Sequence, residues 1–440
     1  MKTGTIISLL TILAFSLSMP LFAQSGSGIP DFRGSLGPRS SFEPTKISVE
    51  EVKYIGISPI NASDTVILKN CAAILRNDID FSPYFEIVLL DSFFMRHMEL
   101  QEMTLLGWGW MGSAYVIRLE AEFPSENLRL TYRLYSTSTQ KEIRKQKFES
   151  NKLYYRDLIH EMANDIIKFL TGDDGIYRTK IAYIRQFNGA KELYISDYDG
   201  YNERQLTNNK SINLSPAFTP DGEFIYFTSY LDGYPKIYML TLKNNNIDLI
   251  AGYPGINAAP AVSPDGKYVA AVLSKDGNSE IYLLDRKGKI VKRLTYSWAI
   301  ESSPTWSPDG KEIAFTSDRT GSPQIYIMDA EGTNVRRLTY EGKYNDSPCW
   351  SPRGDRIIYI SRDRVFKIYS IDVMGREYKV LAELGDNENP HFSPDGNHII
   401  FSSTRMGPSE LYLMDLFGRK QQRLTNKGGY SNPIWSPIRK

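Results

Sequence analysis

The sequence is poor in the residues that most often carry out chemistry. Its 440 residues include only two cysteines, Cys71 and Cys349, and four histidines. The cysteines fall in different predicted domains and the histidines lack metal-ligand spacing, so neither a disulfide framework nor a zinc site is indicated. A P-loop, a G-x-S-x-G elbow and a C-x-x-C pair are also missing. We therefore predict no catalytic residue, no metal site and no cofactor.

An excess of charge of one sign is absent as well. The chain has 52 Lys and Arg against 51 Asp and Glu, a net charge of +1. Binding to nucleic acid depends on neutralising phosphates, so we expect no nucleic-acid partner. A long apolar run occurs only near the start, where Lys2 precedes residues 5–19 and Ala23 offers a cleavage point. The run is short for a membrane span, so we expect a signal peptide over residues 1–23 and an exported, soluble protein.

The sequence then changes character twice. Residues 24–44 are rich in Ser, Gly and Pro and predict a flexible N-terminal tether. Residues 45–172 alternate strand and helix patterns and predict an α/β domain. The expected strands are residues 52–57, 85–90, 114–120 and 128–136. One expected helix follows a cap on Asp64, and a second covers residues 155–170.

Beyond Gly175 one phrase recurs. "SPDG" stands at residues 263–266, 307–310 and 393–396, and its variants stand at 219–222, 351–354 and 436–437. Successive prolines of the phrase are 44, 44, 44, 42 and 43 residues apart. Each period holds four short strand patterns with turns between them, which is typical of a β-propeller blade.

The number of strands at the two ends of the repeat predicts a closed ring. Residues 176–440 open with three strands that lack an inner partner and end with one inner strand, residues 433–436. We expect that last strand to complete the first blade, because closure removes open sheet edges. The fold class is therefore an all-β six-bladed β-propeller at the C-terminal end, preceded by a small α/β domain. We expect a monomer.

The repeated phrase is a turn. Pro fixes φ near −65° and Gly accepts the positive φ that closes the turn, while Arg353 replaces the Asp in one copy. A ring of catalytic carboxylates is thus not indicated. His160 begins "HEMAND", in which Asn164 stands where a zinc helix needs its second His, so we expect a packed histidine. "GWGWMG", residues 107–112, is expected to be a structural loop.

The opposite end of the propeller is the better candidate for binding, because its loops are not dictated by turn chemistry. Polar residues stand at matching places before the inner-strand prolines and should surround the mouth of the axial channel. They either cap loops or form a docking face for another protein, and both alternatives stay open here. The candidates are Asn213, Asn257, Glu301, Ser302, Asn345, Asp346, Asn387 and Glu388, with Tyr430 at the sixth such place.

Three segments of the chain resemble the TolB family of exported propeller proteins. They are residues 76–88 "RNDIDFSPYFEIV", 108–122 "WGWMGSAYVIRLEAE" and 158–184 "LIHEMANDIIKFLTGDDGIYRTKIAYI". The resemblance implies a non-enzymatic periplasmic adaptor of the Tol–Pal system, which acts in outer-membrane integrity and cell division. Its implied partners are the lipoprotein Pal on the propeller and TolA on the N-terminal segment, and other envelope proteins are further candidates.

The resemblance also implies particular contact residues. The family's Pal-binding loops match Ile256, Asn257, Ala259, Ser302 and Ser303 here. The N-terminal segment is longer than the family's. In it, Ile29, Phe32 and Leu36 are the candidate TolA contacts.

An alternative function would use the channel mouth differently. A propeller-based hydrolase would need titratable groups close together in a cleft. A glycan-binding module would display aromatic rings beside amides, and Tyr234, Tyr253, Trp298 and Tyr430 are the candidates for it.

Overall fold

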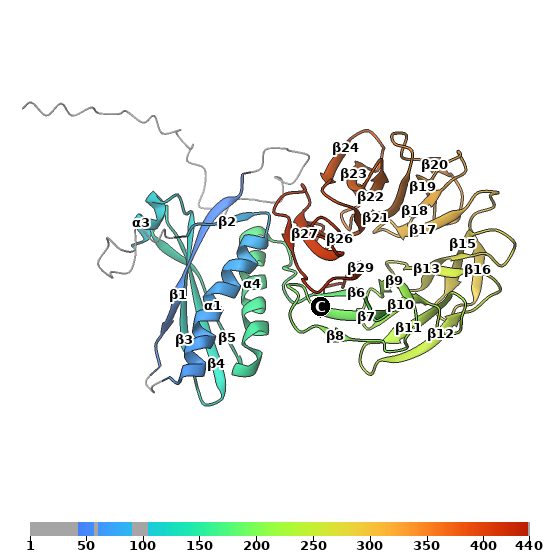
Figure 1. Ribbon diagram of the computed structural model, residues 1–440. Coiled ribbons are helices and arrows are strands. Elements are labelled where there is room, and N and C mark those ends of the chain that lie inside the picture. Colours follow the sequence, from blue (N-terminus) through green and yellow to red (C-terminus); the bar gives the residue numbers. More distant parts are fainter. Residues whose placement is uncertain (1–42, 57–59, 90–103, 439–440) are drawn as a thin grey trace, which may run out of the picture.

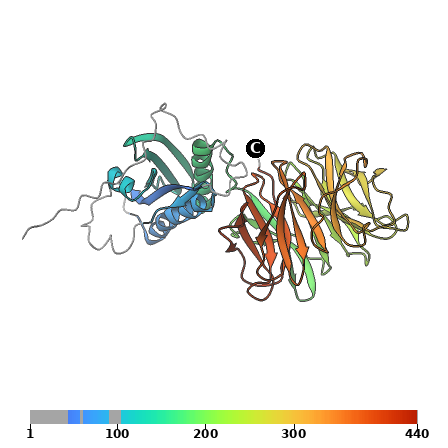
Figure 2. The same cartoon turned by 90° about the horizontal axis from the view of Figure 1, so that it is seen from above.

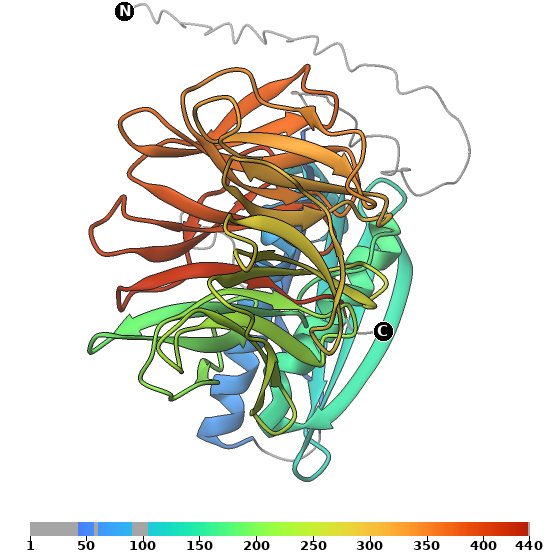
Figure 3. The ribbon, with the colours of Figure 1, turned by 90° about the vertical axis from the view of Figure 1, so that its right-hand side faces the viewer.

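The structure is a computed structural model that describes residues 43–56, 60–89 and 104–438 (Figure 1). An α/β part lies beside a ring of β-sheets, next to the blades that contain β26, β27 and β6 to β8 (Figures 1 and 2). Figure 3 shows the α/β part behind the propeller. The predicted signal peptide and all of the predicted tether except residues 43 and 44, with Ile29, Phe32 and Leu36, lie outside the described residues.

The α/β part is a five-stranded sheet in the order β2-β1-β3-β4-β5. Helices α1 and α4 pack against each other and share one hydrophobic core with the sheet (Figure 1). The elements are β1 (Thr45–Tyr54), α1 (Ala62–Phe81), β2 (Phe85–Ile87), α3 (Leu105–Trp110), β3 (Tyr115–Glu122), β4 (Asn127–Ser136), β5 (Lys141–Asn151), the 3-10 turn η2 (Lys152–Tyr154) and α4 (Tyr155–Thr171).

Two helix starts differ from the sequence prediction. The cap of α1 is Asn61, whose Oδ1 accepts the backbone N–H of Asp64 at 2.8 Å, so the predicted cap on Asp64 is wrong. Asp64 instead places its carboxylate in the first helical turn, where the helix dipole favours it. The "GWGWMG" segment is not a plain loop, because most of it forms α3 behind a cap on Thr104.

The sequence reading missed strand β5 altogether. Its residues, "KEIRKQKFESN", are mostly charged or polar, because β5 is an edge strand with one neighbour, β4. Lysines on an edge discourage pairing with another chain. The inward-facing Arg144 is held by Asp165 of α4 at 2.6 Å.

The six blades predicted from the repeat are confirmed as six four-stranded antiparallel sheets. We number them in ring order. Blade 1 holds β29 (Tyr430–Trp435), β6 (Lys180–Phe187), β7 (Ala190–Asp197) and β8 (Arg204–Gln205); blade 2 holds β9 (Asn213–Phe218), β10 (Phe224–Ser229), β11 (Lys236–Thr241) and β12 (Asn246–Ala251); blade 3 holds β13 (Asn257–Val262), β14 (Tyr268–Leu273), β15 (Glu280–Asp285) and β16 (Ile290–Arg293).

The remaining three blades follow the same order from the inner strand outward. Blade 4 holds β17 (Glu301–Trp306), β18 (Glu312–Ser317), β19 (Gln324–Asp329) and β20 (Arg336–Arg337); blade 5 holds β21 (Asn345–Trp350), β22 (Arg356–Arg362), β23 (Phe366–Asp372) and β24 (Tyr378–Ala382); blade 6 holds β25 (Asn387–Phe392), β26 (His398–Ser403), β27 (Glu410–Asp415) and β28 (Gln422–Arg423).

The acidic residue of each "SPDG" phrase is used within its own turn. Asp265 accepts the Ser263 hydroxyl at 2.6 Å and the Lys267 backbone N–H at 3.1 Å, and Gly266 has φ of 70°. The Ser263 hydrogen bond holds the pKa of Asp265 below its usual value. In the exceptional copy, Arg353 Nε donates to the backbone oxygen of Asp395 at 3.1 Å. These carboxylates therefore stabilise turns and do not form a site.

The ring is closed by strands from the two ends of the repeat. Strand β29 pairs antiparallel with β6, with Tyr430 opposite Arg185 and Trp435 opposite Ile181. The Trp435 side chain is buried, and its Nε1 donates to Thr179 Oγ1 at 2.7 Å. Closure thus joins β29 both to blade 1 and to the segment that leads in from the α/β part.

We predict that Trp435→Ala lowers the free energy of unfolding by about 3–5 kcal/mol, the usual cost of deleting a buried tryptophan side chain. Urea denaturation followed by circular dichroism measures it. Trp298→Ala is the matched control, because Trp298 is 80% exposed and its loss should cost about 0.5 kcal/mol or less. Equal destabilisation by the two substitutions would contradict the closure described here.

Candidate functional site

The two ends of the propeller differ in their exposed apolar side chains. One end, which we call the loop face, carries the loops between second and third strands and the connections between blades. Its exposed large apolar residues are Phe187, Ile212, Tyr230, Leu231, Tyr234, Ile256, Tyr296, Trp298, Ile300, Tyr340, Leu384 and Met406. On the turns of the opposite end, the described residues of this kind are Tyr201, Val335 and Met374.

Aromatic rings dominate the part of the loop face between blades 3 and 5. Trp298 is 80% exposed, and Tyr296 and Tyr340 are 76% and 70% exposed. Arg293 lies over the Tyr296 ring at 4.5 Å and Arg337 over the Tyr340 ring at 4.8 Å. Exposed aromatics beside arginines are the residues that concentrate binding energy in protein interfaces.

Five of the predicted site residues are buried and do not belong to the exposed surface. Asn213, Asn257, Glu301, Asn345 and Asn387 each begin an inner strand, and each is 0% exposed. The expectation that these side chains contact a partner does not fit their burial. Of the two roles considered, capping of loops and contact with another protein, their burial fits the capping of loops.

Their hydrogen bonds show what they do instead. The side chain of Asn257 accepts the Tyr253 backbone N–H at 2.8 Å and donates to the Tyr253 oxygen at 2.7 Å. The Asn345 amide likewise donates to the Glu341 oxygen at 2.7 Å. A buried polar group that holds a connection in this way fixes the shape of the loop face from beneath.

Glu301 departs from the asparagine pattern. Its Oε1 accepts from Ser317 Oγ and from Arg319, both at 3.0 Å. Burial raises the pKa of this carboxyl above its usual range, while the charge of Arg319 acts in the opposite direction. The change from Asn to Glu thereby anchors the loop between β18 and β19.

Asp346 joins two blades. Its Oδ2 accepts from Tyr344 OH at 2.9 Å, and its Oδ1 accepts from Thr316 Oγ1 at 2.8 Å and Ser303 Oγ at 3.2 Å. Thr316 and Ser303 belong to blade 4, whereas Asp346 belongs to blade 5. This carboxylate is therefore a positioning group at the channel mouth.

The other predicted residues remain accessible. Ile256 is 42% exposed and Glu388 is exposed at the start of blade 6, while Ala259, Ser302 and Ser303 are partly exposed. Of the four aromatics considered for glycan binding, Tyr430 is buried and the Tyr253 hydroxyl donates to the Gly288 oxygen at 2.9 Å. Only Tyr234 and Trp298 are freely exposed among those four.

A ring of left-handed residues surrounds the channel mouth, which the sequence reading did not find. Each inner strand has one non-glycine residue with φ between 47° and 55°, directly before its proline and at a break in strand register. This conformation is costly for residues with a side chain. The six residues are Ser215, Ala259, Ser303, Ser347, Asn389 and Asn432.

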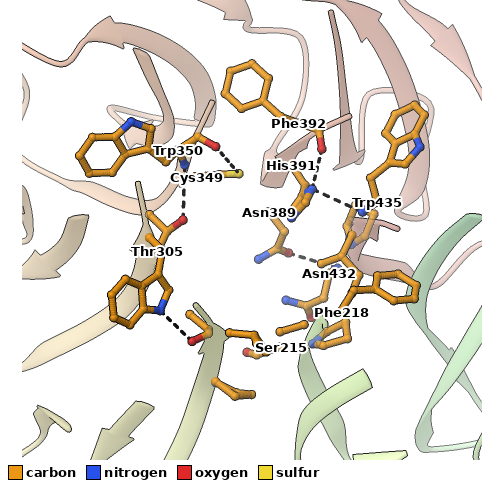
Figure 4. A pocket seen from close by; sticks show the side chains of 18 of the residues that line it. Ser215, Phe218, Thr305, Cys349, Trp350, Asn389, His391, Phe392, Asn432 and Trp435 are labelled. Carbon is orange, nitrogen blue, oxygen red and sulfur yellow. Dashed lines mark hydrogen bonds between the residues drawn. The ribbon is translucent and has the colours of Figure 1, made fainter. Parts of the chain in front are cut away.

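Below the mouth, the axial channel has a volume of about 430 Å³ and is lined by the inner strands of all six blades, with β29 as the inner strand of blade 1 (Figure 4). Many of its lining residues are prolines, and the charged residue types Asp, Glu, Lys and Arg do not occur among those described. Cys349 and His391 are the titratable side chains in it.

Cys349 and His391 are poorly suited to act as a nucleophile and a base. Burial raises the pKa of the Cys349 thiol to about 11, so the reactive thiolate is scarce near neutral pH. Burial also lowers the pKa of His391, whose Nδ1 lies 2.8 Å from the Phe392 oxygen. The Cys349 thiol in turn contacts the Trp350 oxygen at 3.9 Å (Figure 4).

Within the described parts of the chain, His, Cys, Asp and Glu side chains do not gather in groups of three that could hold a metal ion. Among the described helices, none combines the length and apolar character needed to cross a membrane.

The fold and the loop face define a six-bladed propeller protein with an N-terminal α/β part and an apolar, aromatic-rich end. Residues 167–439 match the family model described as TolB beta propeller domain. The chain belongs to the TolB family, as its sequence segments indicated.

Individual relatives agree with this assignment. The Tol-Pal system protein TolB of Desulfosudis oleivorans is 38% identical over 178 residues, which are 40% of this chain and 41% of that protein. TolB of Geobacter metallireducens is 45% identical over 124 residues, 28% of this chain and 29% of that protein. These matched segments span about two fifths or less of the curated relatives. The crystal structure of TolB from Acinetobacter baumannii superimposes with a TM-score of 0.78 at 27% identity, covering 90% of this chain and 98% of that one.

We predict that Ala259→Val destabilises the protein by about 1–2 kcal/mol, because a β-branched residue at positive φ is strained. Ala258→Val is the matched control on the same strand, since Ala258 is likewise partly buried and is not among the residues with positive φ. Urea denaturation of both variants measures the difference. Equal stability would show that the left-handed conformation at Ala259 carries no cost.

Proposed function

We propose that this protein is a non-enzymatic periplasmic adaptor of the Tol–Pal system. It binds the peptidoglycan-associated lipoprotein Pal through the loop face and TolA through its N-terminal segment, and so supports outer-membrane integrity and cell division. The observation that carries the proposal is the concentration of exposed apolar side chains on one end of the ring. Membership of the TolB family supports the choice of partners.

The proposed Pal site is the accessible part of the loop face. Ile256 and Trp298 supply apolar contact, and Glu388 supplies a charge that fixes orientation. Ala259, Ser302 and Ser303 line the mouth between them. The buried residues beneath hold the loops in shape before a partner arrives, which reduces the entropy lost on binding.

The organisation of the chain is part of the proposal. A signal peptide over residues 1–23 directs export, and a tether over residues 24–44 presents the TolA-binding segment. An α/β domain over residues 45–172 and a propeller over residues 176–440 form the folded body of a monomer. An uncharged channel without an activated nucleophile favours this binding role over the hydrolase alternative.

We predict that Trp298→Ala weakens binding of purified Pal about tenfold or more, as truncation of an interface tryptophan commonly does. Ile256→Asp should weaken it further by placing a charge against apolar surface. Isothermal titration calorimetry measures both Kd values. Met374→Ala, on the opposite end of the ring, is the control and should leave the Kd unchanged; equal losses in all three variants would contradict a site on the loop face.

We predict that deleting residues 24–44 abolishes binding to TolA and leaves binding to Pal within about twofold, because the two sites lie on separate parts of the chain. Surface plasmon resonance with each partner in turn measures both. The triple substitution of Ile29, Phe32 and Leu36 by Ala tests the anchor residues within the tether. Undiminished TolA binding by the deletion variant would refute the assignment of the tether.

A further inference from the structure

A buried cluster of titratable side chains joins the α/β part to the propeller. Asp78 comes from α1, His160 from α4 and Tyr198 from the turn that follows β7 of blade 1. Their exposed fractions are 1%, 3% and 3%. Ionisable groups are rarely buried so completely unless they are paired, and here the pairing crosses between the two parts.

Both oxygens of Asp78 are occupied. The His160 Nδ1 atom lies 2.8 Å from Asp78 Oδ2, and the Tyr198 hydroxyl donates to Asp78 Oδ1. The carboxylate therefore receives one contact from the α/β part and one from the propeller. The ring of Tyr198 also meets the His160 ring edge-on, with centroids 5.5 Å apart.

The second nitrogen of His160 has no hydrogen-bond partner. Nε2 is buried, and it lies 3.7 Å from Asp199 Oδ2 of the propeller. Asp199 is itself paired with Arg156 of α4, and Arg156 lies over the Tyr201 ring at 3.5 Å. A proton on Nε2 would therefore face a propeller carboxylate across the boundary.

The groups that face His160 come from every element around it. They are Asp78 on α1, Arg156 on α4 itself, and Tyr198 and Asp199 on the propeller turn. Tyr177 of the connecting segment packs edge-on against Tyr198 at 5.4 Å. Two carboxylates and one guanidinium thus surround the imidazole, which favours its charged form.

We propose that Asp78, His160 and Tyr198 form a pH-sensitive clasp between the α/β part and the propeller. The clasp holds while His160 is protonated and loosens when His160 loses its proton, because buried Asp78 then keeps a charge without a cationic partner. This inference does not depend on the proposed adaptor function.

The direction of the pH effect on the clasp follows from the pKa shifts of His160 and Asp78. Burial alone would lower the pKa of His160, but the hydrogen bond and charge of Asp78, aided by Asp199, raise it above the usual value. Burial raises the pKa of Asp78 above its usual range, against the hydrogen bonds from His160 and Tyr198. The docked cluster therefore retains a proton at a pH where the separated groups would have lost it.

A raised pKa in the docked state sets the pH window. The contribution of His160 to the stability of the contact between the α/β part and the propeller is fully present below about pH 6.5, the pKa of a free imidazole. It is lost as the pH rises through the pKa that His160 has when the two parts are docked. Within that window docking takes up one proton, so its equilibrium constant falls by up to about tenfold per pH unit.

The test follows amide hydrogen exchange of the full chain from about pH 6 to about pH 9, corrected for the intrinsic exchange rate. Protection of the last turn of α1 and of the turn after β7 should fall as pH rises. His160→Gln, which can still donate a hydrogen bond but cannot titrate, should remove this pH dependence. His398→Gln is the matched control, because His398 is a second buried histidine at the same boundary, with Nε2 2.8 Å from the Phe81 oxygen.

Two results would overturn the clasp: pH-independent protection of the wild-type chain, or a pH dependence that His160→Gln preserves, whether or not His398→Gln abolishes it. If His160→Gln fails to fold, the imidazole signals of the wild-type chain decide the matter. With four histidines in the sequence, the resonance of His160 can be assigned and titrated by NMR. An apparent pKa at or below about 6.5 would then refute the proposal.

Discussion

The pairing of β29 with β6 is the interaction on which the rest of the molecule depends. It makes blade 1 from strands that are far apart in the sequence, and it covers the edge of β6 that would otherwise lie unpaired. The same region anchors the segment between the two parts, since Trp435 Nε1 bonds Thr179 and the Ser436 hydroxyl accepts the Lys180 backbone N–H at 2.9 Å. The strand that closes the ring therefore also holds the segment that connects the α/β part to the propeller.

The loop face and the part of the ring that contacts the α/β part differ in what covers them. The loop face is apolar and aromatic at its surface, and buried amides and carboxylates such as Asn257 and Glu301 hold it rigid. The side of the ring at blades 6 and 1 is instead occupied by the α/β part, through His398 on Phe81 and Tyr198 on Asp78 (Figure 2).

The sequence reveals the ring well because each blade depends on local turn chemistry, which Pro and Gly report directly. It reveals the α/β part less well. The sequence pattern did not predict β5, because an edge strand such as Lys141–Asn151 needs little apolar alternation. The place of Asn213 three residues before its proline is visible in the sequence, but its burial depends on neighbouring strands and is not. The Asp78–Tyr198 contact joins residues 120 positions apart, and no local pattern encodes such a pair.

The ring of left-handed residues has a consequence for orientation. Since every inner strand bends in the same way before its proline, the backbone alone would offer a visiting ligand six interchangeable rotational settings. The residue just ahead of each bend removes that degeneracy. Around the circle it changes from apolar through hydroxyl to acidic and back: Leu214, Ala258, Ser302, Asp346, Glu388 and Ser431. In this nearly six-fold symmetric ring, these side chains alone therefore distinguish one rotational orientation of a ligand from the other five.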